Sequence, residues 1–205
     1  MPALTTLVYL HGFLSSPASP KAAVFARAAQ QRGVACRIPN LNVTDPAALE
    51  AVLSEAAADL ADGTWAVAGS SLGGFYAAHL MPGQPQRRLL LNPAVNPWDY
   101  AAPYRGKTVR AADGTAVTVT SEWIEYLRRK AETASSPETT LVMVTTGDEI
   151  LDWRRTPGVF PKSPMWTVPG SDHAVSDISR YIDALFLFLM RGVVPETLPA
   201  AAQHD

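Results

Sequence analysis

Short apolar segments alternate along the chain with longer amphipathic ones. Residues 4–10 are apolar, rich in strand-forming residues and followed by a glycine, which predicts a buried strand. Similar segments predict five more strands, at residues 35–38, 65–68, 89–91, 141–144 and 165–168. Because predicted helices separate these strands, the pattern indicates a parallel sheet that is covered by helices on both faces.

Signals for the start of a helix follow the first two predicted strands. Ser19-Pro20 and Asp45-Pro46 each place a capping residue before a proline, and Gly33 predicts the end of the first helix. The last predicted helix runs from about residue 177 to 190. Its apolar stripe should pack on the sheet and consists of Ile178, Tyr181, Ile182, Leu185, Phe188 and Leu189. We therefore predict an α/β fold with a mostly parallel, doubly wound sheet of about six strands.

The segment between the predicted strands 89–91 and 141–144 is too long for an ordinary connection. Within it, Asp113-Gly114 predicts a hairpin turn between residues 108–112 and 115–119, and residues 122–130 predict a helix. Insertions at this point of a doubly wound sheet lie above the carboxyl ends of the strands, where ligands bind. We predict one domain at 4–191 with a cap-like insertion at 93–138, followed by a loose tail at 192–205. The alternative is that the insertion is a surface excursion without a role at the site.

The pentapeptide Gly69-Ser70-Ser71-Leu72-Gly73 matches the G-x-S-x-G pattern, with Ser71 at its centre. A predicted strand precedes it and a predicted helix, 72–80, follows it. A serine nucleophile with this pattern lies in a sharp turn from strand to helix, which holds the serine in a strained conformation. Glycines are needed where side chains would collide with the backbone. The context predicts that Ser71 is a nucleophile.

A second signal, His11-Gly12-Phe13, lies at the end of the first predicted strand. A tetrahedral intermediate on Ser71 needs two N–H donors directed at its oxyanion. The amide of Leu72 is one candidate, and the amide of Phe13 is the other because Gly12 allows a tight turn there. We interpret His11 as a structural residue whose ring holds this loop, in preference to an acid–base role.

The general base is predicted to be His173, in a loop between the last strand and the last helix. His79 falls inside the helix after the nucleophile, and His204 falls in the tail. His173 alone combines a loop position with the order serine, acid, histidine along the chain.

The carboxylates of Asp148, Glu149 and Asp152 follow the strand at 141–144 and are candidates for the acid that orients His173. Asp148 comes first after the glycine turn, where a triad acid belongs. Asp152 lies one helical turn later and remains an alternative. Asp172 is the weaker candidate, because a side chain seldom curls back to the imidazole of the next residue.

The composition and net charge of the chain limit the kinds of molecule it is expected to bind. The chain has 205 residues, of which 47% are hydrophobic and 18% charged, and its net charge of −2 includes no long basic run. This balance is typical of a soluble domain and gives no electrostatic basis for binding nucleic acid or an anionic membrane. Cys36 is the only cysteine and falls in a predicted buried strand, so we interpret it as a core residue. The lack of a possible internal disulfide, of a signal-peptide pattern and of a segment long enough to span a bilayer predicts a cytoplasmic protein.

Patterns for other chemistries are missing from the sequence. It contains no Walker sequence, no G-x-G-x-x-G after a strand and no H-E-x-x-H. Its four histidines are too few and too scattered to indicate a metal centre. We therefore expect no metal and no cofactor.

Several of these segments together resemble one known family, the YqiA/UPF0227 esterases. The resemblance spans residues 4 to about 190 and is carried by 7–13, Ser15-Ser16-Pro17, Lys21-Ala22, 69–77, 92–95, 146–149 and Asp172-His173. It implies a compact α/β hydrolase with esterase activity on short acyl esters or thioesters, and Ser71, Asp148 and His173 as its triad. The match is loose over 99–138 and at the proline-rich region 154–163, both of which should shape the pocket.

These observations predict a serine hydrolase that cleaves a small acyl ester or thioester through an acyl-enzyme on Ser71. His11 and the aromatic residues Phe13, Phe75, Tyr76, Trp98 and Tyr104 are candidates for the substrate pocket. Two alternatives remain open. One is an amidase, a peptidase or an acyl-CoA thioesterase with the same triad, and the other is a non-catalytic binding protein with a hydrolase fold. The oligomeric state is not predicted.

Overall fold

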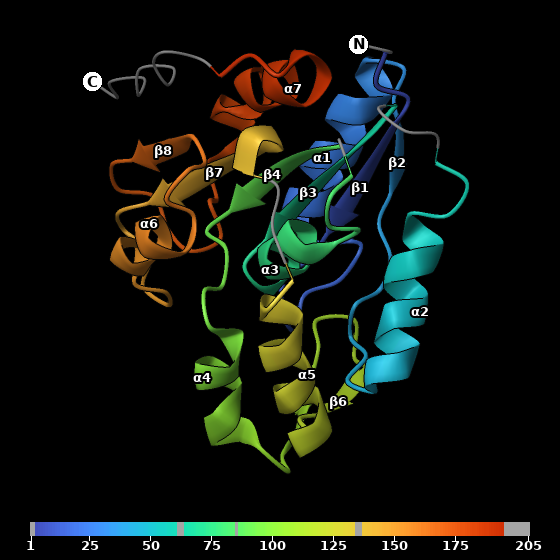
Figure 1. The fold of residues 1–205 in the computed structure, drawn as a ribbon, viewed down its shortest axis with the longest axis vertical. Helices are drawn as coiled ribbons and strands as arrows, with labels where there is room; N and C mark the ends of the chain where they lie inside the picture. Colours follow the sequence, from blue (N-terminus) through green and yellow to red (C-terminus); the bar gives the residue numbers. More distant parts are fainter. Residues whose placement is uncertain (1–2, 61–63, 85, 134–136, 195–205) are drawn as a thin grey trace.

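A computed structural model describes residues 3–60, 64–84, 86–133 and 137–194. Its central feature is a parallel sheet of six strands in the order β2-β1-β3-β4-β7-β8 (Figure 1). The strands are β1 (Thr6–Leu10), β2 (Ala35–Arg37), β3 (Trp65–Ser70), β4 (Arg87–Leu91), β7 (Thr140–Thr145) and β8 (Met165–Val168). The predicted α/β architecture and the parallel sheet are confirmed.

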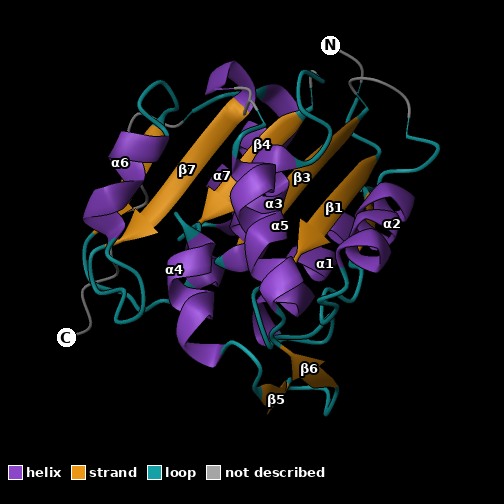
Figure 2. Cartoon of the chain, turned by 60° about the horizontal axis from the view of Figure 1, so that its bottom comes forward, coloured by secondary structure: helices purple, strands orange, loops and turns teal. Residues whose placement is uncertain are grey.

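Helices cover both faces of this sheet (Figure 2). The principal ones are α1 (Pro20–Gln31), α2 (Pro46–Ala56), α3 (Leu72–His79), α5 (Ser121–Ala131) and α7 (Ile182–Arg191). On one face α1 and α7 enclose a core cluster that includes Leu7 and Met143, while α2, α3 and α5 enclose a second cluster on the other face that includes Val8 and Val142. Consecutive strand residues enter opposite clusters because side chains alternate across a strand.

Polar side chains cap the amino-terminal ends of three helices. Ser19 Oγ accepts a hydrogen bond from the amide of Ala22 at α1, and Asp45 Oδ1 accepts one from Ala48 at α2. Thr120 does the same for Trp123 at α5. These bonds satisfy amides that have no partner within the helix. They explain why α1 and α2 begin where the sequence predicted, and why α5 begins at Ser121, one residue before its predicted start.

The segment between β4 and β7 holds α4 (Pro97–Ala101), the hairpin of β5 (Thr108–Arg110) and β6 (Ala116–Thr118), and α5. The antiparallel hairpin confirms the turn predicted at Asp113-Gly114. Figure 2 shows α4 and the hairpin beyond the carboxyl ends of the strands. Trp123 and Leu127 of α5 are buried in the core cluster over α3. The insertion therefore forms part of the core, and a cap function for it stays a prediction.

Three details differ from the sequence-based expectations. The first strand begins at Thr6, and Cys36 is half-buried because β2 is an edge strand. The last helix, α7, begins only at Ile182, after a 3-10 turn. Asp177 does not cap it, because its carboxylate accepts hydrogen bonds from Ser171 Oγ and Tyr181 Oη. Most of the predicted loose tail, 195–205, lies outside the described residues.

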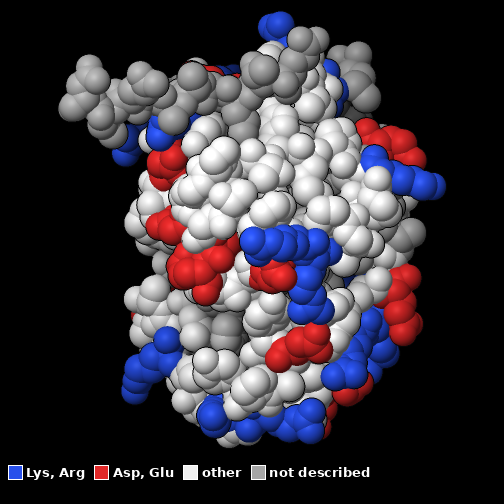
Figure 3. All heavy atoms as spheres, turned by 90° about the vertical axis from the view of Figure 1, so that its left-hand side faces the viewer, with Lys and Arg blue, Asp and Glu red and all other residues white. Residues whose placement is uncertain are grey.

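The short elements α6 (Thr156–Val159) and β8 complete the far edge of the fold. On the face shown in Figure 3, acidic and basic side chains lie next to one another, and neither sign covers it continuously. None of the helices in the described part of the chain is both long and apolar enough to cross a membrane.

Candidate active site

Ser71 occupies the sharp turn between β3 and α3. Its backbone has φ 56° and ψ −122°, a conformation that is unfavourable for a residue with a side chain. Two backbone hydrogen bonds of 3.0 Å hold it there, from Ser71 N to the carbonyl of Leu91 and from Ala94 N to the carbonyl of Ser71. The surrounding fold thus maintains the strain that a G-x-S-x-G turn requires.

The two glycines of the pentapeptide are dictated by close backbone contacts. A Cβ atom on Gly69 would lie 2.1 Å from the carbonyl oxygen of Gly73. A Cβ atom on Gly73 would lie 2.0 Å from the carbonyl oxygen of Leu10, at the end of β1. The lack of side chains at both positions therefore allows the turn to close and lets the end of β1 approach it.

His11 fixes the loop that follows β1. Its Nε2 accepts a hydrogen bond of 3.0 Å from the amide of Leu41, so Nδ1 carries the proton and donates to the carbonyl of Gly12 at 2.9 Å. Burial is the main cause that lowers the pKa of His11, and only 1% of the residue is exposed. The ring is neutral with both nitrogens engaged. This geometry supports the structural role and leaves His11 outside the walls of both cavities beside Ser71.

The same loop brings Gly12 and Phe13 against the nucleophile turn. A Cβ atom on Gly12 would lie 3.2 Å from Cβ of Ser71, so the glycine permits this approach. The Phe13 ring is stacked on Trp123 with 5.4 Å between centroids. Leu72 is the first residue of α3, and amides at the start of a helix have no partner within it. The amides of Phe13 and Leu72 remain our candidates for the oxyanion donors.

His173 and Asp148 are in direct contact. His173 Nδ1 lies 2.8 Å from Asp148 Oδ2, while Asp148 Oδ1 accepts hydrogen bonds from the amides of Ile150 and Leu151. Burial raises the pKa of Asp148, but the bonds from His173 and the two amides outweigh it, and the net pKa is below the ordinary value. Because an ionised carboxylate only accepts, Nδ1 of a neutral His173 carries the proton and Nε2 is free to accept one.

Two of the other candidate acids, Asp152 and Asp172, are engaged elsewhere. Asp152 is at the start of a 3-10 turn, accepts a hydrogen bond from the amide of Arg154 and pairs with the Arg154 side chain. Asp172 accepts hydrogen bonds from the amide and the hydroxyl of Ser176. Of the three, Asp148 is the acid that the structure places on the His173 ring.

Two residues to which the sequence alone assigned no specific role, Glu149 and Asn92, support the His173 loop. Glu149 Oε2 accepts a hydrogen bond of 2.9 Å from the amide of His173. Asn92, which has a positive φ of 40°, donates to the carbonyls of Asp172 and His173 and accepts from the amide of Thr145. The signal available for Asn92 was its position directly after the predicted strand 89–91, and the signal for Glu149 was its place next to Asp148 in the loop that follows the strand 141–144.

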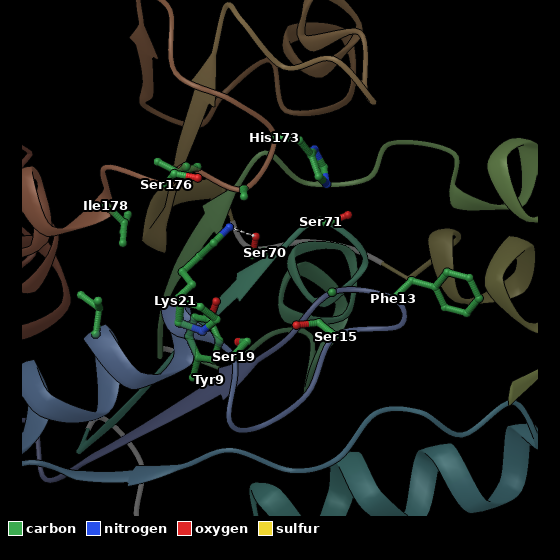
Figure 4. A pocket seen from close by; sticks show the side chains of 15 residues that line it. Tyr9, Phe13, Ser15, Ser19, Lys21, Ser70, Ser71, His173, Ser176 and Ile178 are labelled. Carbon is green, nitrogen blue, oxygen red and sulfur yellow. Dashed lines mark hydrogen bonds between the residues drawn. The ribbon is translucent and has the colours of Figure 1, made fainter. Parts of the chain in front are cut away.

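Ser71 and His173 line two cavities, and Figure 4 shows the one that also contains Lys21. In Figure 4 the His173 ring points toward the hydroxyl of Ser71. One cavity, of about 350 Å³, is mainly apolar and lies beneath α4 and α5, where it is lined by Leu72, Tyr100, Tyr104, Trp123 and Leu151 among others. The other, of about 390 Å³, adjoins the start of α1 and contains hydroxyl groups and Lys21. Phe13 lines both cavities.

The structure corrects part of the predicted pocket. Phe13 and Tyr104 line a cavity, but Phe75 and Tyr76 are core residues, because the helix after Ser71 is enclosed between the sheet and α5. Tyr76 Oη accepts a hydrogen bond from Trp123 Nε1 within that core. Trp98 packs against the same core with Arg128 over its ring, and lines neither cavity.

His79 does not reach the site. His79 packs against Phe75 with 4.8 Å between ring centroids, and its Nδ1 contacts Thr133. This agrees with its expected place on a packed helix. His204 lies outside the described residues.

Several solved structures are similar in fold to this chain. Est1E from Butyrivibrio proteoclasticus is 15% identical, with a TM-score of 0.66 over 91% of this chain and 88% of its own. The mouse alpha/beta hydrolase domain-containing protein 10 is 17% identical, with a TM-score of 0.65 over 92% and 90%. The esterase domain of a Rhodothermus marinus protein is 17% identical, with a TM-score of 0.61 over 92% and 85%.

At these identities the likeness establishes the fold, which is that of the α/β hydrolases. The sequence itself matches the model of an uncharacterised protein family, UPF0227, over residues 6–190. The chain therefore belongs to UPF0227, which confirms the resemblance carried by its motifs.

Proposed function

We propose that this protein is a serine hydrolase that cleaves carboxylic esters or thioesters through an acyl-enzyme on Ser71. The observation that carries the proposal is the contact between Asp148 and His173, 2.8 Å, in a site where His173 and the strained Ser71 line the same cavities. This arrangement has the roles of a serine–histidine–aspartate triad.

In the first half-reaction, Ser71 Oγ attacks the carbonyl carbon of the substrate while His173 Nε2 takes the serine proton. Asp148 stabilises the imidazolium that forms, and the amides of Phe13 and Leu72 stabilise the oxyanion. His173 then gives the proton to the departing alcohol or thiol, which leaves an acyl group on Ser71. Water attacks that acyl group with His173 again as the base, and releases the carboxylic acid.

The apolar cavity favours an acyl chain or an alkyl or aryl alcohol on one side of the scissile bond. Its lining is aromatic and aliphatic and includes Tyr100, Tyr104, Trp123 and Leu72. The esterase activity named for the Rhodothermus domain is consistent with such chemistry. Amides and thioesters are cleaved by the same sequence of steps, so the bond class depends on the leaving group.

Hydrolysis of 4-nitrophenyl butyrate tests the proposal. The wild-type protein should release 4-nitrophenol, and the Ser71→Ala variant should lose about 10³-fold or more in kcat, since the nucleophile is removed. Ser54→Ala on the exposed side of α2 is the matched control and should retain wild-type rates. A butyryl amide and a butyryl thioester measured alongside would rank the three bond classes. A folded wild-type protein that cleaves none of these compounds would contradict the proposal.

A further inference from the structure

Lys21 is a cationic side chain in the second cavity beside Ser71. It extends from the first turn of α1 and its Nζ donates a hydrogen bond of 2.6 Å to Ser70 Oγ, the residue before the nucleophile (Figure 4). Both Lys21 and Ser70 line the cavity together with Ser71 and His173. A positive charge is thus held at the edge of the reacting centre.

The position of Lys21 is unfavourable for the fold alone. The amino-terminal end of a helix carries a partial positive charge, so a lysine in the first turn opposes the helix dipole. The first turn of α1 contains no acidic residue to offset it. Among the described residues, no carboxylate oxygen lies within 4.0 Å of Lys21 Nζ. The ammonium group has three donors, and the described residues supply one acceptor, Ser70 Oγ.

Two carboxylates at longer range keep this amine charged. Burial lowers the pKa of Lys21 to about 8, and the charges of Asp172 and Asp148 partly counteract the burial. The amine is therefore predominantly protonated at neutral pH. Both carboxylates are already engaged, Asp148 with His173 and Asp172 with Ser176, so neither neutralises Lys21 by direct contact.

Part of the remaining wall of the cavity is polar. The lining contains the hydroxyl-bearing residues Tyr9, Ser15, Ser19, Ser70 and Ser176, beside apolar residues such as Val24 and Ile178 (Figure 4). Lys21 is the only lysine or arginine among the residues that line the cavity. A single positive charge among neutral hydroxyls matches a group with one negative charge, such as a carboxylate, better than a phosphate dianion.

We propose that Lys21, with the hydroxyls of Ser15 and Ser19, forms a carboxylate subsite, so that the preferred substrates are esters or thioesters that carry a second, free carboxylate. The charged end of the substrate occupies the Lys21 cavity, and the rest extends past Ser71 into the apolar cavity. This inference rests on the proposed serine hydrolase activity and specifies its substrate class. Lys21 selects the substrate and takes no proton from Ser71, because its amine is bonded to Ser70.

Two pairs of esters that differ by one charge test the inference. For the acyl side, the mono-4-nitrophenyl ester of adipic acid is compared with the 4-nitrophenyl ester of adipamic acid, its neutral amide. For the alcohol side, 4-carboxyphenyl butyrate is compared with 4-carbamoylphenyl butyrate. The readout is the ratio of kcat/KM for the charged ester to that for the neutral ester, measured on one preparation at pH 7. The amount of folded enzyme and the efficiency of the triad cancel in this ratio.

For the wild type, the ratio of kcat/KM should be about ten or more in at least one pair of esters. This is the size expected for a charge-assisted hydrogen bond. Lys21→Met should reduce that ratio about tenfold, Lys21→Arg should retain much of it, and Lys162→Met, at an exposed lysine, should leave it unchanged. A Lys21 that served only to hold Ser70 would alter rates without altering the ratio.

The outcomes separate this inference from the proposed function. If the wild-type enzyme cleaves both neutral esters through Ser71 but shows no preference for charge in either pair, the subsite is wrong and the hydrolase assignment stands. A preference that survives in Lys21→Met also overturns the subsite. If neither the charged nor the neutral esters are cleaved, the hydrolase assignment fails and the subsite fails with it.

Discussion

His173 Nδ1 lies 2.8 Å from Asp148 Oδ2, although 25 positions separate the two residues in the chain. The contact forms because the loops after β7 and β8 lie side by side, with Gly147 N donating to the carbonyl of Gly170. Gly147 has no room for a side chain, since a Cβ atom there would lie 2.2 Å from the carbonyl oxygen of Ser171. The parallel pairing of the last two strands thus brings an acid and a base to one edge.

Asp148→Asn should lower kcat for 4-nitrophenyl butyrate by about 10⁴-fold, the loss that the same change causes in a serine protease. An amide at this position holds the imidazole in the wrong tautomer while filling the same space. Asp152→Asn, four residues away, should cost about tenfold or less, because among the described residues the Asp152 carboxylate bonds to Arg154 and not to His173. Steady-state kinetics of both variants decide the assignment, and the reverse ranking would transfer the role to Asp152.

His11→Phe should destabilise the fold by about 1–3 kcal/mol, because the amide of Leu41 and the carbonyl of Gly12 both lose their buried partner. The loop that carries Phe13 should move as well, so kcat should fall about tenfold through a weaker oxyanion site. Urea denaturation and ester kinetics measure the two effects. A variant with wild-type stability and no activity would instead assign the His11 ring to the chemistry.

His79 should make the fold sensitive to acid. Burial lowers its pKa from 6.5 to about 4, assisted by the charges of Lys130 and Arg88 and opposed by the hydrogen bond to the Thr133 carbonyl. Between pH 6.5 and about 4 the unfolded chain therefore binds more protons at this residue than the folded chain does. The free energy of unfolding must then decrease as the pH falls through this window, and the loss is complete below it.

The test compares denaturation midpoints of the wild type and His79→Gln at pH 7 and pH 5. The wild type should lose more stability between the two pH values than the variant, in which the titrating ring is absent. Acidic groups that titrate nearby are common to both proteins and cancel in the comparison. Equal losses would show that His79 does not contribute.

The sequence predicted a sheet of parallel strands and the place of Ser71 at the turn from strand to helix, because both depend on local rules. The length and apolar character of their segments identify β3 and β7 as buried strands. Glycines at 69 and 73 identify the turn that joins β3 to α3. The choice between Asp148 and Asp152 needed the structure. The sequence favours Asp148 because it comes first after the glycine turn. Only the fold shows that the amides of Ile150 and Leu151 hold its carboxylate in contact with His173.

The cavity walls were harder to predict. Every residue of α3 from Leu72 to Ala78 is buried, so no polar face shows which side of that helix meets the substrate. The assignment of Phe75 and Tyr76 to the pocket failed for this reason. The depth of Lys21 also depends on how α1 packs against the end of β3, which is a tertiary contact. Its one local sign is a lysine in the first turn of a helix, against the dipole.

The central claim is that Ser71 is the nucleophile, and labelling of the folded protein with a fluorophosphonate probe tests it most directly. The probe forms a stable bond only with an activated serine, and peptide mass spectrometry identifies the labelled residue. We expect modification of Ser71, none in Ser71→Ala, and continued modification of Ser71 in both Ser54→Ala and Ser70→Ala. Modification of Ser70 instead, or of no residue in a correctly folded protein, would contradict the account.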